Sequence, residues 1–202
     1  TLDKDKCIGC ASCIKRCPTE AIRIRNGKAC VIYDKCIACG ECVRICPSNA
    51  KIPSYDKFDI VNNYKYKVAL IAPSFYGQFD DIKDINYILT AFRNIGFDFV
   101  YEVGIGAELV SQVTQRLFAD DKLKKPIIST ACPAVLELVS QRFENLLGNL
   151  LPLLAPVDVA AKLAREKVAK RGVAEEDIGV FFISPCPAKV YALKAGCTVN
   201  RN

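Results

Sequence analysis

Beyond residue 66 the apolar residues fall into short runs and helical spacings that alternate along the chain. Residues 67–72 form a short apolar run of the kind that is buried in a parallel sheet. In 80–95 apolar residues recur at helical spacing, and Gly96 follows where a helix would end. Strands alternating with helices predict a parallel sheet covered on both faces. Further strands are expected at 97–103, 126–130 and 178–184, and further helices at 107–118, 133–147 and 157–171.

The residues before position 66 show a different pattern. Ala21–Arg25 and Ala29–Tyr33 flank Asn26-Gly27, which is a strong signal for a two-residue β-hairpin turn. Short helices are expected after Cys10 and Cys39. Residues 57–66 have no sustained period and are interpreted as a linker.

Two copies of one cysteine pattern occupy this first part of the chain. Each reads Cys-x-x-Cys-x-x-Cys-x-x-x-Cys-Pro, and every cysteine of the second copy lies 29 residues after its counterpart, which indicates an internal duplication. Eight thiolates at this spacing suit two cubane clusters, with the cysteine before each proline binding the other cluster. The arrangement resembles a bacterial two-cluster ferredoxin. The predicted ligands are Cys7, Cys10, Cys13 and Cys46 for one [4Fe-4S] cluster, and Cys36, Cys39, Cys42 and Cys17 for the second.

Zinc sites and disulfides explain this pattern less well. Zinc sites use paired Cys-x-x-Cys knuckles separated by a longer loop, and cysteines three residues apart in a tight loop are poorly placed to pair. The chain has twelve cysteines and shows no secretory signal and no run long enough to span a membrane. A cytoplasmic, metal-binding protein without a membrane partner is therefore expected.

The formal net charge of +6 does not indicate a nucleic-acid partner. Up to Ile60 there are eleven Lys or Arg residues against seven Asp or Glu residues. Two oxidised cubanes, each with four thiolates, would offset about that local excess of positive charge. No basic stripe with interleaved aromatic residues occurs elsewhere, so no nucleic acid is expected.

The predicted fold class follows from these two patterns. The first fifty-odd residues cannot bury enough apolar surface to fold alone, so the clusters are expected to form their core. We predict an α+β two-cluster ferredoxin domain at 1–56, the linker at 57–66, and an α/β domain with a mostly parallel sheet at 67–202.

The ends of the predicted strands carry the other candidate residues. One strand leads into Ala72-Pro73-Ser74, and later ones lead into Cys132-Pro133 and Cys186-Pro187. Ligands of open α/β sheets bind outside the carboxyl ends of the strands, and a proline suits the first position of a helix. Each thiol would then lie near a helix N-terminus, as a metal ligand or a nucleophile. The alternative, a small buried hydrophobic residue, stays open from spacing alone and is preferred for Cys30 and Cys197.

Two longer motifs surround these cysteines, namely Ser-Thr-Ala-Cys132-Pro-Ala-Val and Ser-Pro-Cys186-Pro-Ala-Lys189. Together with the duplicated pattern they resemble the [FeFe]-hydrogenase large subunit over nearly the whole chain. The resemblance implies that Cys132 and Cys186 bind the [4Fe-4S] half of an active-site cluster that carries a di-iron unit. It also implies that Lys189 hydrogen-bonds a cyanide of this unit, and that Ala72, Pro73 and Ser74 cradle it.

Several positions depart from the hydrogen-evolving members of that family. In those members the first motif resembles Thr-Ser-Cys-Cys-Pro, and the first of its two cysteines passes protons to the di-iron unit. This chain has Ala131 at that position, and a methyl group cannot transfer a proton. Leu109–Phe118, on the helix where the family has proton-relay glutamates, contains no carboxylate, and Ser184 replaces a family methionine. The chain has no tryptophan or histidine. These differences resemble the branch proposed to be sensory.

The third family motif, Glu-x-Met-x-Cys-x-x-Gly-Cys, has no match after Cys186, so we expect one portion of a longer or split protein with an incomplete hydrogenase-like fold. The complete protein would hold a third [4Fe-4S] cluster linked to the di-iron unit. It would bind hydrogen and exchange electrons with a redox partner protein or a low-potential carrier. The predicted role is low-turnover or sensory. A non-catalytic hydrogenase-like iron–sulfur assembly factor and a ferredoxin-type electron-transfer module are the alternatives, and whether the chain is an enzyme stays open.

Overall fold

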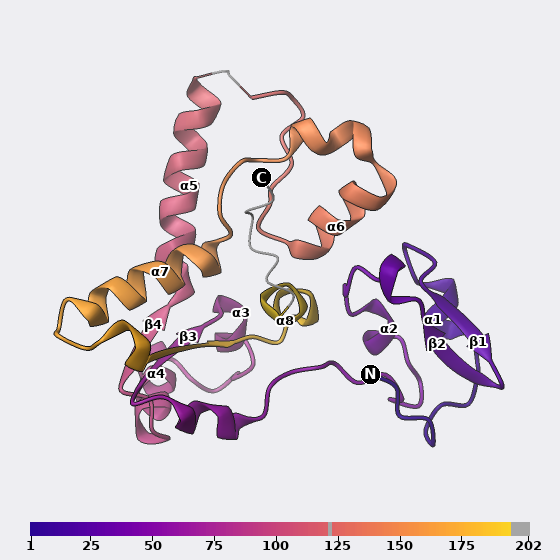
Figure 1. Ribbon diagram of the computed structural model, residues 1–202, viewed down its shortest axis with the longest axis horizontal. Coiled ribbons are helices and arrows are strands. Elements are labelled where there is room, and N and C mark those ends of the chain that lie inside the picture. The colour runs from indigo at the N-terminus through magenta and orange to yellow at the C-terminus, as the bar shows by residue number, and fades with distance from the viewer. Residues whose placement is uncertain (121–122, 195–202) are drawn as a thin grey trace. The chain divides into compact units, whose positions relative to one another are not determined.

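The computed structural model describes residues 1–120 and 123–194 (Figure 1). Their contacts divide them into two units, one made of 1–55, 124–151 and the residues from 186 onward, the other of 56–123 and 152–185. The domain limits expected from the sequence stay predictions. None of the helices in the described ranges is both long and apolar enough to cross a membrane.

Residues 1–55 contain short elements around the duplicated cysteines. Asn26 and Gly27 have φ angles of 50° and 72°, as a type I′ hairpin turn requires. The predicted hairpin and both predicted short helices are confirmed. The elements are α1 (Ser12–Lys15), the antiparallel pair β1 (Ile22–Arg25) and β2 (Lys28–Val31), the 3₁₀ helix η1 (Tyr33–Lys35), and α2 (Glu41–Arg44).

The duplication seen in the sequence extends to the backbone. Helices α1 and α2 begin 29 residues apart, and residues with positive φ recur at the same offset. The left-handed conformation costs a non-glycine residue about 1–2 kcal/mol, so its repetition indicates two loops shaped for the same task. The pairs are Gly9 with Ala38, Ala11 with Gly40, and Glu20 with Asn49.

The rest of the first unit consists of α6 (Pro133–Arg142), the 3₁₀ helix η3 (Glu144–Asn149) and α8 (Pro187–Lys194). The helix predicted at 133–147 therefore ends at Arg142. The strand predicted at 126–130 is wrong, because in the described part of the chain it makes a single parallel bridge, between Ile128 and Leu150. Pro126 has no N–H to donate, and its carbonyl accepts from the Asn149 side chain at 2.7 Å instead of from a strand.

The second unit contains a three-stranded parallel sheet (Figure 1), which confirms the predicted sheet type and three of the predicted strands. Strand β3 (Tyr66–Ile71) lies between β4 (Phe99–Glu102) and β5 (Ile178–Ile183). Val68, Ala69, Leu70 and Ile71 are all almost fully buried. Their burial explains the continuous apolar run, because both faces of the strand are covered.

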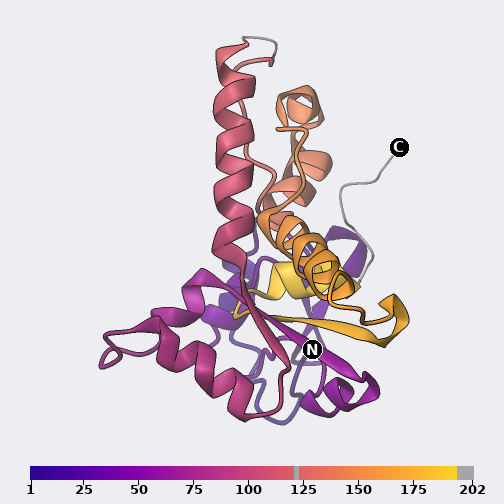
Figure 2. The same cartoon turned by 90° about the vertical axis from the view of Figure 1, so that its left-hand side faces the viewer.

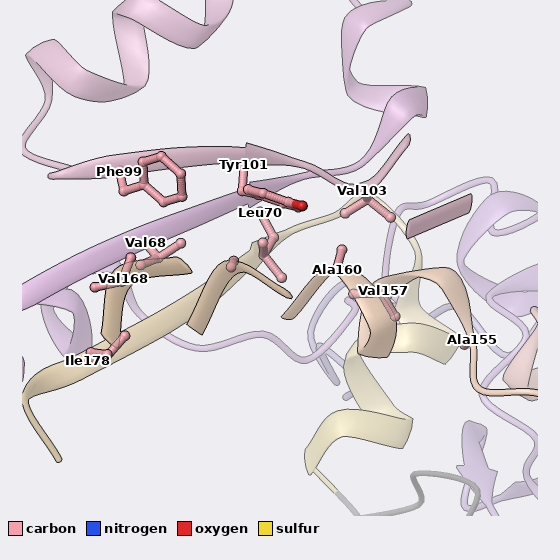
Figure 3. Packing of buried hydrophobic residues seen from close by; sticks show 11 residues of the cluster. Val68, Leu70, Phe99, Tyr101, Val103, Ala155, Val157, Ala160, Val168 and Ile178 are labelled. Carbon is pink, nitrogen blue, oxygen red and sulfur yellow. The ribbon is translucent and has the colours of Figure 1, made fainter. Parts of the chain in front are cut away.

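Helices cover both faces of this sheet. On one face, side chains of β3 and β4, among them Leu70 and Tyr101, point toward Val157 and Ala160 of α7 (Pro156–Ala169) (Figure 3). On the other face, Ile88 and Phe92 of α4 pack against Ala69 and Ile71 of β3. The second unit also contains the short helix α3 (Pro73–Tyr76) and the 3₁₀ helices η2 (Phe58–Asn63) and η4 (Glu175–Asp177).

Two predicted helix starts are wrong. Helix α4 runs Ile85–Asn94, because the Asp84 carboxylate accepts the Asn86 N–H at 2.9 Å and caps the helix there. Helix α5 runs Val103–Ala119 and begins earlier than expected, through two glycines that disfavour a helix in a sequence pattern. The segment predicted as a linker is also partly ordered, since Val61 of η2 is buried in the sheet core.

Gly106 explains why glycine is used at the start of α5. Helix α7 crosses this end of α5 (Figure 2), and a Cβ at Gly106 would lie 2.3 Å from the Pro156 carbonyl oxygen and 2.9 Å from the Ala160 nitrogen. Gly106→Ala is therefore expected to lower the free energy of unfolding by about 1–3 kcal/mol, despite the better helix propensity of alanine.

The matched control is Gly104→Ala, because a Cβ at Gly104 meets nothing within 4 Å among the described residues. It should leave stability unchanged or raise it by up to about 1 kcal/mol. Urea unfolding followed by circular dichroism measures both variants. Equal stability of the two would contradict the proposed close approach of α5 and α7.

Candidate iron–sulfur sites

The first candidate site is a hollow of about 320 Å³ in residues 1–55. Four thiols line it, and they are the four that the spacing assigned to one cluster. Its other walls are mostly apolar, with Leu2 and Ile24 among them. Cys7 and Cys13 are each only 8% exposed, so bulk water is largely kept from these donors. The thiols are those of Cys7, Cys10, Cys13 and Cys46.

The second candidate site is a hollow of about 370 Å³ that is lined by the other predicted set of thiols. Val31, Ile22 and Ile37 are among its apolar walls. The fold thus brings each predicted set together, although the ligand assignment itself stays a prediction. The eight cysteines of the motifs are free thiols. The second set consists of Cys17, Cys36, Cys39 and Cys42.

Backbone N–H groups point at the sulfur atoms in a duplicated arrangement. The Ala21 N–H donates to Cys17 Sγ and the Ala50 N–H donates to Cys46 Sγ, each at 3.2 Å and 29 residues apart. The Ala29 N–H donates to Cys7 Sγ at 3.5 Å. Because N–H donors stabilise a charged sulfur, these contacts prepare the thiols to act as thiolate ligands.

Burial and hydrogen bonding act in opposite directions on these thiols. Burial raises the pKa of Cys39. The Ser12 hydroxyl, hydrogen-bonded to Cys10, lowers the pKa of that thiol. At Cys46 burial opposes ionisation, but hydrogen bonds from Ser48 and from the backbone outweigh it and lower the pKa. Cys10 and Cys46 are therefore easier to ionise than Cys39 when a cluster is bound.

The donor set fits a cluster better than a single ion. Within 1–120 and 123–194, no three Cys, Asp or Glu side chains converge closely enough to hold one metal ion. In a cubane each of the four irons takes one thiolate, so the donors surround a volume instead of a point. Four sulfur donors around an apolar hollow match that requirement.

Cys132 and Cys186 lie at the starts of two helices, as predicted, although no strand of the described residues leads into Cys132. Cys132 precedes Pro133 at the start of α6, and its carbonyl accepts the Val135 N–H at 3.1 Å. Cys186 precedes α8, and its carbonyl accepts the Val190 N–H at 3.2 Å. Cys132 is exposed and Cys186 is half-buried.

Lys189 connects these two motifs. Its Nζ donates to the Ala131 carbonyl at 3.2 Å, so the start of α8 is tied to the loop before Cys132. Ala131 presents only a methyl group at the position where the family resemblance predicts a proton-transferring thiol in hydrogen-evolving members. The predicted contact of Lys189 with a cyanide stays a prediction.

Ala72, Pro73 and Ser74 belong to the other unit and lie at the carboxyl end of β3, where the sequence predicted them. The Ala72 N–H donates to the Ile183 carbonyl at 3.2 Å, which fixes this segment against the end of β5. Ala72 is buried, whereas Pro73 and Ser74 are exposed. Their predicted role as a cradle is not tested.

Sequence reasoning missed two polar groups. The Tyr76 hydroxyl donates to the Glu102 carboxylate at 3.1 Å, and burial together with the charge of Glu102 raises the Tyr76 pKa. Lys51 is buried in the wall of the first hollow, and no charge pattern indicated this.

Three further predictions concern Cys30, Cys197 and the carboxylates of helix α5. Cys30 is exposed on β2, so its interpretation as a buried hydrophobic residue is wrong. Cys197 lies outside the described residues. Helix α5 contains one carboxylate, Glu108, which the predicted helix at 107–118 also included and which accepts a hydrogen bond from the Gln112 side chain. The interval Leu109–Phe118 nevertheless has none.

Two hollows lined by four thiols each indicate an iron–sulfur protein, and the same chain contains a unit built on a parallel sheet. The family model for the iron-only hydrogenase large subunit, C-terminal domain, matches residues 65–195, and that for a 4Fe-4S dicluster domain matches residues 1–47. The chain belongs to the iron-only hydrogenase large-subunit family. The resemblance predicted from the motifs is confirmed.

The chain is similar to several known proteins. The chain is 26% identical to iron hydrogenase 1 of Clostridium pasteurianum over 95% of this chain and 38% of that protein. It is 54% identical to ferredoxin-2 of Desulfomicrobium norvegicum over 14% of this chain and 48% of that protein. A solved [FeFe]-hydrogenase aligns with a TM-score of 0.47 and 21% identity, covering 62% of this chain and 35% of that one. The chain thus spans less than half the length of each of these proteins.

Proposed function

We propose that this chain carries electrons between a redox partner and a hydrogen-binding active-site cluster, in a low-turnover or sensory [FeFe]-hydrogenase-like protein. One contact carries the proposal. Ile37, which lies between two cysteines of the second set, packs in one apolar cluster with Ala134 and Ala188. These alanines each lie two residues after a predicted ligand of the active-site cluster.

A second contact in the same unit supports this route. A Cβ at Gly40 would lie 2.6 Å from Pro187 Cγ, so the loop of the second cysteine set closely approaches the start of α8. Cys186, just before that helix, also packs against the cluster of Ile37. The second set of thiols and the start of α8 are thereby held together, as a protein that positions redox groups requires.

Each group implied by the family would have residues to hold it. The two sets of four thiols would hold two [4Fe-4S] clusters, which supply one-electron transfer when bound. Cys132 and Cys186 would provide two ligands of a third [4Fe-4S] cluster linked to a di-iron unit. The redox partner would be a protein or a low-potential carrier, and the location cytoplasmic.

Ala131 supports the low-turnover part of the proposal. Its methyl group holds no proton, and the Lys189 ammonium beside it already donates to the Ala131 carbonyl. Without a group to hold and release a proton at this position, a step that needs proton transfer is slow. Slow turnover together with ligand binding suits a sensor.

An anaerobic infrared spectrum of the full-length, maturase-treated protein tests this function. We expect carbon monoxide and cyanide bands under argon that shift when hydrogen replaces it. The control variant Cys132→Ala should lose these bands while both cubanes stay loaded. Absence of the bands from wild-type protein with both cubanes loaded would leave an electron carrier or an assembly factor, and the hydrogenase proposal would fail.

A further inference from the structure

Lys51 is a charged side chain in a place where charges are costly. It is only 5% exposed, and its Nζ has no hydrogen-bond partner among the described residues. Its backbone is held by an antiparallel bridge to Leu2. A buried ammonium without a counter-charge costs several kcal/mol, which requires an explanation.

Lys51 lines the first hollow together with its four predicted ligands. A cubane with four thiolates carries net negative charge, and one-electron reduction makes it more negative. The charge of Lys51 also reaches the thiols electrostatically. Burial raises the pKa of Cys13 in this hollow, and the positive charge of Lys51 is the strongest opposing effect there. The same charge also opposes the effect of burial on the pKa of Cys42, a thiol of the second set, so its field extends beyond the hollow that Lys51 lines.

The internal duplication shows that this lysine is not needed merely to build such a site. The residue 29 positions earlier is Ile22, which is 3% exposed and lines the second hollow. The same place in the two copies therefore holds a hydrocarbon beside one set of thiols and an ammonium beside the other. This difference predicts different redox properties for two otherwise similar sites.

We propose that the Lys51 ammonium is a built-in counter-charge for the cluster held by Cys7, Cys10, Cys13 and Cys46, and makes this cluster the easier of the two to reduce. The inference rests on the two-cluster part of the proposed function. A positive charge at this place favours the reduced form, which has one more negative charge, over the oxidised form. Lys51 therefore acts on the cluster through its positive charge and does not bind iron.

A redox titration of the reconstituted full chain, followed by electron paramagnetic resonance, tests the inference. Lys51→Met keeps the length of the side chain and removes its charge, while Lys51→Ile copies the other half of the duplication. Both variants are expected to lower the equilibrium constant for reduction of one of the two clusters by about tenfold. This corresponds to a decrease of about 59 mV in the reduction potential of that cluster for one electron. The reduction potential of the other cluster should change less.

Two control variants separate charge at this site from other effects. Lys51→Arg keeps the charge and should keep the wild-type potentials. Lys4→Met removes one exposed charge from the same unit and should also leave them unchanged. If Lys51→Met loses a cluster that Lys51→Arg retains, the iron content alone supports the role of Lys51 as a counter-charge.

Three results would overturn the inference. Unchanged potentials in Lys51→Met and Lys51→Ile, with both clusters loaded, would show that the charge has no redox effect. Loss of the cluster in Lys51→Met and Lys51→Arg alike would make the position purely steric. A shift of equal size in Lys4→Met would assign the effect to net charge. A wild-type chain without clusters would instead refute the proposed function.

Discussion

Cys13→Ala is expected to remove one cluster directly and, by unfolding residues 1–55, to release the second, whereas Cys30→Ala should leave both intact. Alanine cannot bind iron, and the second set of thiols also lies within 1–55, so the variant should lose most of the about eight irons after anaerobic reconstitution. The cluster lost directly is the one held by the first set of thiols. Iron analysis and the electron paramagnetic resonance signal of the reduced protein measure this loss.

The predicted unfolding follows from the small core of this part of the chain. Its buried apolar cluster consists of five residues, and two of them, Cys7 and Cys13, are themselves predicted ligands. Ile22 is the one large aliphatic side chain among the remaining three. So little buried apolar surface cannot offset the conformational entropy of some fifty residues, and the bound clusters must supply the difference.

Hydrogen exchange distinguishes unfolding of residues 1–55 from a general loss of structure. In Cys13→Ala, amides of 1–55 should exchange quickly, while those of β3 and α7 stay protected in their separate apolar core. Cys30 is the matched control, because it is a cysteine of the same part of the chain but is exposed on β2. Full iron content in Cys13→Ala, or an equal loss in Cys30→Ala, would contradict the ligand assignment.

The sheet of the second unit could be predicted because buried strands have a strong apolar pattern in the sequence. A strand covered on both faces needs apolar residues throughout, and Val68–Ile71 meet this need. The eight motif cysteines could be predicted equally well, because the spacing of ligands within a tight loop is a local property. Both the buried strand and the cysteine motifs are determined largely by residues that are close in sequence.

Two of the wrong predictions share a cause that lies elsewhere in the chain. Gly106 disfavours a helix locally, but the backbone of α7 lies where a Cβ would be. The segment at 126–130 has the composition of a strand, yet Asn149 satisfies the Pro126 carbonyl. In both cases a tertiary contact outweighs the local propensity, and no window of sequence contains both partners.

Lys51 shows the same limit at the candidate site. A lone lysine in a sequence is normally a solvated surface residue. Only the fold reveals that the short N-terminal segment at Leu2 pairs with it and that this buried lysine lines a thiol-lined hollow. The 29-residue offset could have drawn attention to it, because it pairs Lys51 with the apolar Ile22.

Ala131→Cys is expected to raise hydrogen turnover of the complete, matured protein by about 10²-fold or more. A positioned group that holds and releases a proton contributes about 10²–10⁴-fold to a step that needs proton transfer, and a thiol can do this where a methyl group cannot. The substitution should be tolerated, because the structure uses the Ala131 backbone, whose carbonyl accepts from Lys189 Nζ and whose N–H donates to the Ser129 hydroxyl. The rate of hydrogen-dependent dye reduction measures the effect.

Ala131→Ser is the matched control for this variant. Serine has nearly the size of cysteine, but its hydroxyl does not ionise near neutral pH, so it should gain far less activity. A cysteine thiol has an ordinary pKa of about 8.5, so the gain in Ala131→Cys should also depend on pH between about 7 and 9. If Ala131→Cys shows the infrared bands of a di-iron unit yet turns over no faster than wild type, the missing thiol does not limit the rate. The low turnover would then have to arise elsewhere along the proton path, with the shortage of carboxylates in Leu109–Phe118 as the next candidate.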